Sequence, residues 1–99
     1  MTTISSQRYL DASIVAAKST AEDYEVTVVP VSIEGIDYLV VVDGHHSLAA
    51  AKADGVEPDY TIDRTSEIAR HAAASPADWM AQHQLDSEWY DVQTGLDVW

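Results

Sequence analysis

The residues with the clearest capacity for chemistry are Asp43, Gly44, His45, His46 and Ser47, which follow one another without interruption. A carboxylate can bind a cation or accept a proton, and imidazoles titrate near neutral pH, donate hydrogen bonds or bind metals. A serine hydroxyl can cap a helix or contact a phosphate, and glycine permits a sharp bend. Asp-Gly is also among the commonest turn pairs, so the first two residues have a purely structural explanation as well.

The segments on either side would place this group at a bend between a strand and a helix. The run YLVVVD, residues 38–43, predicts a strand that is apolar on both faces and therefore central in its sheet. Residues 46–54 predict a helix that ends at Gly55. Because a helix start offers free N–H groups and the positive end of its dipole, it attracts phosphates and carboxylates.

A phosphate or nucleotide cradle is therefore predicted at this bend. Gly44 and the backbone N–H groups of His45, His46 and Ser47 would hold the phosphate, with Lys52 as the one cation of the same helix. Asp43, His45 and His46 are the candidate catalytic residues, and Asp43 is the candidate ligand for Mg²⁺. A metal site formed by both histidines is disfavoured, because adjacent histidines seldom reach one ion.

The remaining pattern predicts a small α/β (α+β) domain that spans residues 1–99. Residues 24–33 predict a strand that forms a hairpin with residues 38–43 through the turn at 34–37, and Pro30 favours an edge position or a broken strand. A strand at 59–62 completes a strand-helix-strand unit. Helices are predicted at residues 5–19, from Asp63 or Thr65 to Ala74, and from a Ser75 cap onward. The core would lie at residues 24–62, with a helical, acidic and aromatic extension at 63–99.

Composition limits the function further. The chain has 17 Asp and Glu residues against 5 Lys and Arg residues, a formal net charge of −12, so direct binding to nucleic acid is improbable. It has no cysteine, which removes disulfides and thiolate chemistry. Neither a signal peptide nor a membrane span is recognisable, which predicts a cytoplasmic protein.

The segment YLVVVDGHHSLAAAKADGVEPDYTI resembles the core of the ParB/sulfiredoxin superfamily, and the preceding VVPVSIEGI fits the hairpin that leads into its motif. The resemblance covers about residues 24–62. It implies binding of ATP or CTP with Mg²⁺, with the phosphates at the motif and at the following helix start. It also implies, for some members, phosphotransfer or NTP hydrolysis, with Gly44, Asp43 and His45 at positions of the kinase-like branch.

The departures from that family are as informative as the match. Ser47 stands where most members have a phosphate-gripping arginine, which predicts a weaker site. His45 stands where sulfiredoxins have their catalytic cysteine, so reductase chemistry is excluded. Two functions therefore stay open: a nucleotide-binding or phosphate-binding domain with undecided catalysis, and a degenerate acidic module that binds a protein as an inhibitor, DNA mimic or antitoxin-like partner.

The aromatic residues of the C-terminal segment carry the second hypothesis. Trp89, Tyr90 and Trp99 lie among acidic residues and are the candidate contacts for a protein partner. The alternative is that Trp79 and Trp89 pack onto the sheet and that Trp99 frays at the chain end.

Overall fold

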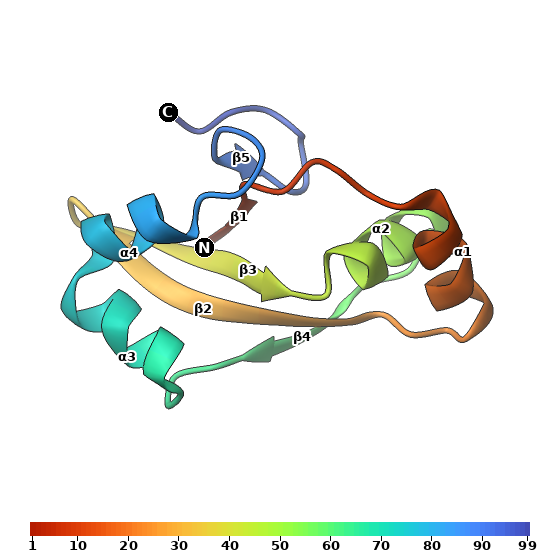
Figure 1. The fold of residues 1–99 in the computed structure, drawn as a ribbon, viewed down its shortest axis with the longest axis horizontal. Coiled ribbons are helices and arrows are strands. Elements are labelled where there is room, and N and C mark those ends of the chain that lie inside the picture. The colour runs from red at the N-terminus through yellow and green to blue at the C-terminus, as the bar shows by residue number, and fades with distance from the viewer.

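A computed structural model describes residues 1–99 as a small α+β domain with a five-stranded mixed sheet and four helices (Figure 1). In chain order the elements are β1 (Thr2–Ser5), α1 (Ala12–Thr20), β2 (Glu25–Ile33), β3 (Ile36–Asp43), α2 (His45–Asp54), β4 (Asp59–Ile62), α3 (Glu67–Ala74), α4 (Pro76–His83) and β5 (Tyr90–Asp91). None of the helices is long and apolar enough to cross a membrane.

The sheet has the strand order β4-β2-β3-β1-β5, so β3 is its central strand, as predicted. β3 is antiparallel to β2 and parallel to β1, whereas β4 is parallel to β2 and β5 is antiparallel to β1. The strand-helix-strand prediction needs one correction. α2 leads from β3 to β4, but β4 pairs with β2, so the crossover unit includes the whole hairpin.

The β2–β3 hairpin accommodates two features that are uncommon in strands and turns. These are the positive φ of Glu34 in the turn and the proline at position 30 within β2. Glu34 and Gly35, the two residues of the turn, have φ angles of 51° and 81°. Positive φ at both positions is typical of the type I′ turn that joins twisted antiparallel strands. β4 pairs with β2 only from Glu25 to Val28, so Pro30 lies where that side of β2 is open. The strand continues through Pro30 without a break.

The N-terminal helix prediction is wrong at its start. Residues 2–5 form β1, in which Ile4 pairs with Val40, and α1 begins only at Ala12. Ser5 is fully buried instead of capping a helix, and the cap is Asp11, whose carboxylate accepts a hydrogen bond from the Ser13 amide. Ser66 caps α3, in place of the predicted Asp63 or Thr65.

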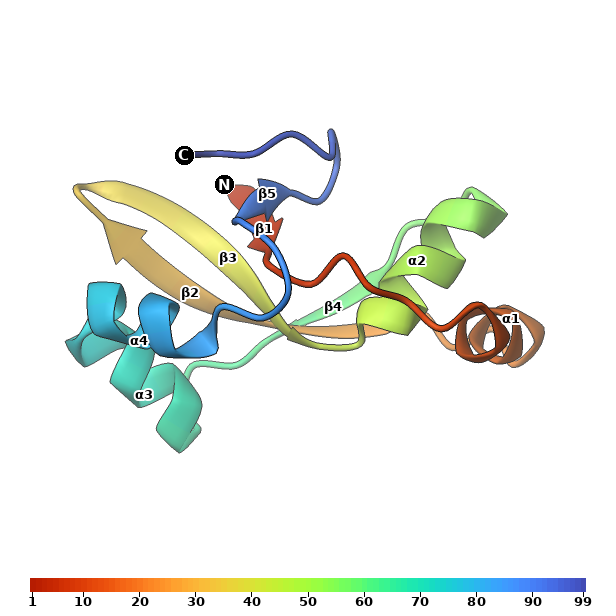
Figure 2. The same ribbon diagram turned by 45° about the horizontal axis from the view of Figure 1, so that its top comes forward.

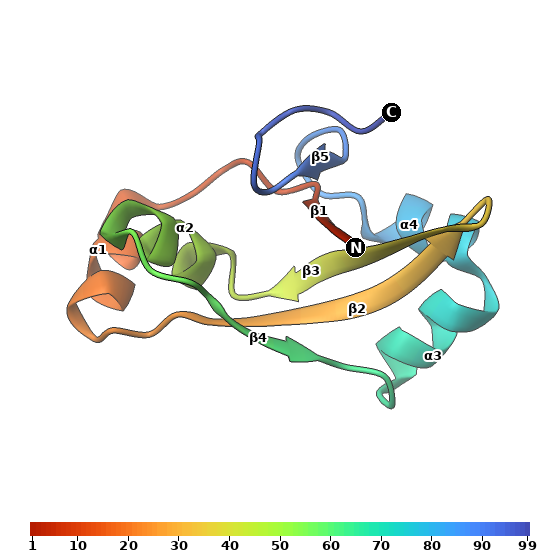
Figure 3. The same cartoon turned by 180° about the vertical axis from the view of Figure 1, so that it is seen from behind.

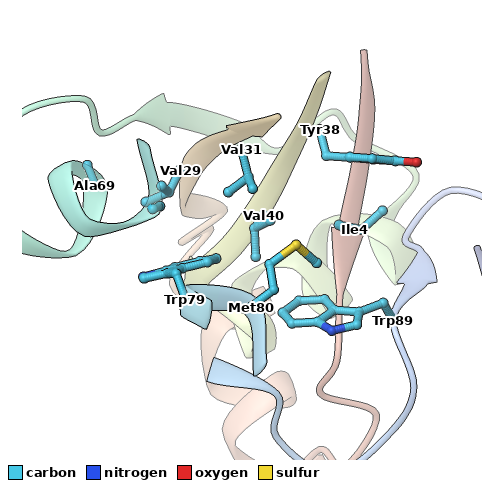
Figure 4. Packing of buried hydrophobic residues seen from close by; sticks show 10 residues of the cluster. Ile4, Val29, Val31, Tyr38, Val40, Ala69, Trp79, Met80 and Trp89 are labelled. Atoms are coloured by element: carbon cyan, nitrogen blue, oxygen red, sulfur yellow. The ribbon is translucent and has the colours of Figure 1, made fainter. Parts of the chain in front are cut away.

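The main hydrophobic core lies between the sheet and the α3–α4 pair (Figure 4). Trp79 and Met80 of α4 meet Val29 and Val40 of the hairpin, and Trp89 closes the core from the C-terminal segment. The segment from residue 63 onward is thus an integral part of the hydrophobic core. α1 and α2 pack together at the opposite end of the sheet (Figure 2).

The turn conformation leads to a stability prediction. Replacing Glu34 by Asn should raise the free energy of unfolding by about 0.5–1 kcal/mol, because Asn adopts positive φ more readily than Glu. Urea unfolding measures the change. The control is Glu34→Gln, which removes the same charge without the backbone preference; equal stability of both variants would contradict the explanation.

Candidate functional site

The bend between β3 and α2 has the geometry of an open helix start. The Gly44 amide is already used, because it donates to Asp43 Oδ1 at 2.9 Å. The first helical hydrogen bond runs from the Leu48 amide to the Gly44 carbonyl at 2.8 Å, and no side chain caps the helix. The amides of His45, His46 and Ser47 belong to the first turn, where the helix itself offers them no acceptor and no side chain caps them.

Gly44 is required here for a steric reason as well. Its φ angle is 91°, and a Cβ at this position would lie 2.4 Å from the Glu25 carbonyl oxygen and 2.9 Å from Val26 Cα. The bend therefore passes directly over the backbone of β2, and only glycine leaves space for that approach. The group that lies closest to Gly44 is therefore the backbone of β2.

His45 faces the N-terminal strand. Its Nε2 forms a 2.8 Å hydrogen bond with Ser5 Oγ, and the same oxygen accepts from the Gln7 amide. Burial lowers the pKa of the half-buried His45 imidazole, and the neighbouring His46 lowers it further, whereas Asp43 and Asp86 act in the opposite direction. His45 is thus held as a neutral ring that joins the start of α2 to the end of β1.

His46 faces the start of α1. Its Nε2 accepts a 3.1 Å hydrogen bond from the backbone amide of Asp11, so this nitrogen carries no proton while the bond exists. The neutral ring then carries its proton on Nδ1. Two consecutive histidines therefore have separate structural partners in two different segments, and the site retains one N–H donor from His46.

The sequence did not reveal the cation of this site, which is Lys18 on α1. Its Nζ lies 2.8 Å from Asp23 Oδ2, and Asp23 Oδ1 lies 3.4 Å from the hydroxyl of Ser47. The hydrogen bond with Asp23 raises the pKa of Lys18, so the ammonium group stays charged. Lys18 was missed because helix packing, and no local pattern, brings α1 beside the first turn of α2.

These elements surround a hollow of about 340 Å³. Its lining includes Asp43, Gly44, His45, His46 and Ser47, together with Val42, Lys18, Gln7 and Leu85. The structure thus brings five of the predicted site residues together around one space. Ser47 is almost fully buried, so its place in the lining is deep and an arginine at this position would not fit without rearrangement.

Lys52 lies elsewhere. It borders a smaller neighbouring hollow of about 100 Å³, and its Nζ donates to the Val92 carbonyl at 2.5 Å. A phosphate held at the start of α2 would therefore meet Lys18 and not Lys52.

A metal site needs several converging ligands, and the chain has no cluster of three or more His, Cys, Asp or Glu residues suited to one. Asp43 offers a single exposed carboxylate, one oxygen of which is engaged by Gly44. A cation at Asp43 would have to take its remaining ligands from a bound molecule or from water.

The predicted aromatic contacts do not form one exposed group. Trp89 is 8% exposed and belongs to the core, which confirms the packing alternative and removes it as an exposed anchor. Tyr90 is half-buried, donates its hydroxyl to the Gln7 carbonyl and lies under the Arg8 guanidinium. Trp99 alone is widely exposed, and its ring is tilted against that of Tyr38.

Comparison with known proteins identifies no relative: no family model, no curated protein and no solved structure matches this chain.

Gly44→Ala tests the steric account of the bend. We expect it to lower the free energy of unfolding by about 2 kcal/mol or more, because the added Cβ meets the β2 backbone and positive φ strains the residue. The matched control is Gly95→Ala, where φ is 77° but a Cβ meets open space. Equal losses in chemical denaturation would show that the close approach carries no cost of its own.

The lowered pKa of His45 predicts a pH dependence of stability. The unfolded chain binds a proton at this residue near pH 6.5, before the folded protein does, so the contribution of His45 is complete above that pH. It falls as the pH drops from 6.5 through the folded pKa. Urea unfolding between pH 5 and 8 should therefore show a shallower loss on acidification in His45→Gln than in the wild type.

The control for that series is His71→Gln, which makes the same substitution at an exposed histidine of α3. Comparing variants is necessary, because acidification also reduces the repulsion among the many carboxylates. Identical slopes for His45→Gln and the wild type would rule out the assigned role.

Proposed function

We propose that the hollow at the start of α2 binds a small phosphate-bearing ligand. The observation that carries this proposal is the set of three first-turn backbone amides, those of His45, His46 and Ser47, which no side chain caps and whose residues line a polar hollow. Such amides, aligned with the helix dipole, favour an anion.

The neighbouring side chains add complementary donors. Lys18 supplies a charged ammonium group and His46 supplies an Nδ1–H, because its other nitrogen accepts from the Asp11 amide. Asp23 offsets part of the Lys18 charge, and Asp43 lies in the same lining. The balance predicts a site of modest affinity, since the bidentate arginine of stronger phosphate sites has no counterpart here.

The resemblance of the Asp-Gly-His-His motif to the ParB/sulfiredoxin superfamily extends the proposal to ATP or CTP as the ligand class. In that case Mg²⁺ would contact Asp43 and the phosphates together, because nucleotide-bound Mg²⁺ often takes only one or two protein carboxylates. The proposal concerns binding, and we assign no catalytic step to Asp43, His45 or His46.

Thermal melting tests this proposal with inorganic phosphate, ADP, ATP, CTP and GTP at millimolar concentration, each with and without Mg²⁺. A ligand that binds only the folded chain must raise the melting temperature, and 1 kcal/mol of stabilisation corresponds to about 4–8 °C in a domain of this size. Sodium chloride at matched ionic strength is the reference, because salt screens the acidic surface of any such chain.

Lys18→Gln should reduce the ligand-induced shift by at least half, whereas Arg70→Gln on α3 should preserve it at the same change of net charge. Each variant is compared with its own melting temperature without ligand, which separates binding from stability. The proposal fails if no probe exceeds the salt reference, or if both variants respond as the wild type does.

A further inference from the structure

The two edge strands of the sheet, β5 and β4, differ in whether another segment of the chain covers their outer side. At β5, the C-terminal segment folds back along the strand: Tyr90 bridges to Asp97, the Asp91 amide donates to the Leu96 carbonyl at 2.9 Å, and the Val98 amide donates to the Trp89 carbonyl. At β4, no segment of the chain covers the outer side (Figure 3). The sheet therefore has one closed edge and one open edge.

The backbone of β4 has free groups for a further strand. The Asp59 amide donates to the Tyr24 carbonyl at 2.9 Å and the Asp63 amide donates to the Val28 carbonyl at 2.8 Å, so these residues face β2. Because successive residues of a strand face opposite sides, the N–H and C=O groups of Tyr60 and Ile62 face outward. They form a short row of two donors and two acceptors.

The side chains beside this row are apolar and accessible. Tyr60, Ile62 and Val56 are 40%, 44% and 44% exposed, and a hollow of about 220 Å³ lies between β4 and α2. Tyr60, Val56, Leu48 and Val92 contribute its apolar lining, and Glu57 and Lys52 contribute one charge of each sign. The hollow has room for an aliphatic side chain.

The charges around the edge are mostly negative. Glu57 borders the hollow, and Asp59 lies in β4 beside Glu25, its exposed partner in β2. Of the nearest cations, Lys52 is held by the Val92 carbonyl, and Arg64 lies beyond the end of the strand. An acidic segment would be repelled here, and so would a second copy of this chain with its own charge of −12.

We propose that β4 is a docking edge for an extended, basic segment of a partner protein, which adds to the sheet as a sixth strand. Main-chain hydrogen bonds to Tyr60 and Ile62 would hold the segment, one apolar side chain would enter the hollow, and its Lys or Arg residues would face Glu57, Asp59 and Glu25. This surface is separate from the hollow at the start of α2, which Lys18 and His46 line.

The test uses the full chain and a fluorescently labelled octapeptide of alternating Lys and Val. Fluorescence anisotropy at low salt should show binding, and amide NMR shifts should concentrate at residues 56–63. An otherwise identical peptide that is N-methylated on alternate residues, so that its hydrogen-bonding edge is blocked, should bind about tenfold more weakly. A Glu–Val peptide should not bind. These comparisons leave the fold of the protein untouched.

A matched pair of variants tests the charge. Glu57→Gln should weaken binding of the Lys–Val peptide severalfold, and Glu88→Gln, an exposed acidic residue in the C-terminal segment, should leave it unchanged. Equal affinity for the N-methylated peptide would overturn the proposal, because it would show general attraction to an acidic surface. NMR shifts concentrated away from residues 56–63, or concentration-dependent pairing of the chain with itself through β4, would overturn it as well.

Discussion

The turn from β3 into α2 depends on the absence of a side chain at position 44. A Cβ there would lie 2.4 Å from the Glu25 carbonyl oxygen, so the close passage of the bend over β2 requires glycine. This close contact between the bend and β2 places α2 beside α1. The first turn of α2 then faces the space between the two helices. The hollow, which Lys18 also lines, and the first-turn amides of α2 lie directly beside this contact between two backbone segments.

The two histidines then connect this bend to the rest of the chain. His45 is bonded to Ser5 at the end of β1, and His46 accepts from Asp11 at the start of α1. Each imidazole thus joins α2 to a segment at least 35 residues earlier in the chain. A structural role for both residues is therefore present whether or not a ligand binds, and it explains why the bend has two imidazoles where one turn residue would suffice.

Local patterns predicted the elements whose signals are strong. Continuous β-branched residues identified the central hairpin, and good helix formers ending at Gly55 identified α2. β1 was missed because Thr2–Ser5 has only Ile4 as an apolar residue, and its strand conformation depends on pairing with β3. In the site, residues 43–47 were found together, but Lys18 was not, because only the packing of α1 on α2 brings it there. Lys52 was misplaced because its helical face could not be known.

The folded-back C-terminal segment beside β5 has a consequence for how this molecule can associate. A filament in which sheets pair edge to edge needs two open edges on every molecule, because each added molecule must offer a new open edge to the next one. Here the segment with Asp97 and Val98 covers the β5 edge, so a strand of a second molecule cannot pair there. Growth by that route stops once a single strand has been added at β4, which keeps the valine-rich strands of this domain out of open-ended polymers.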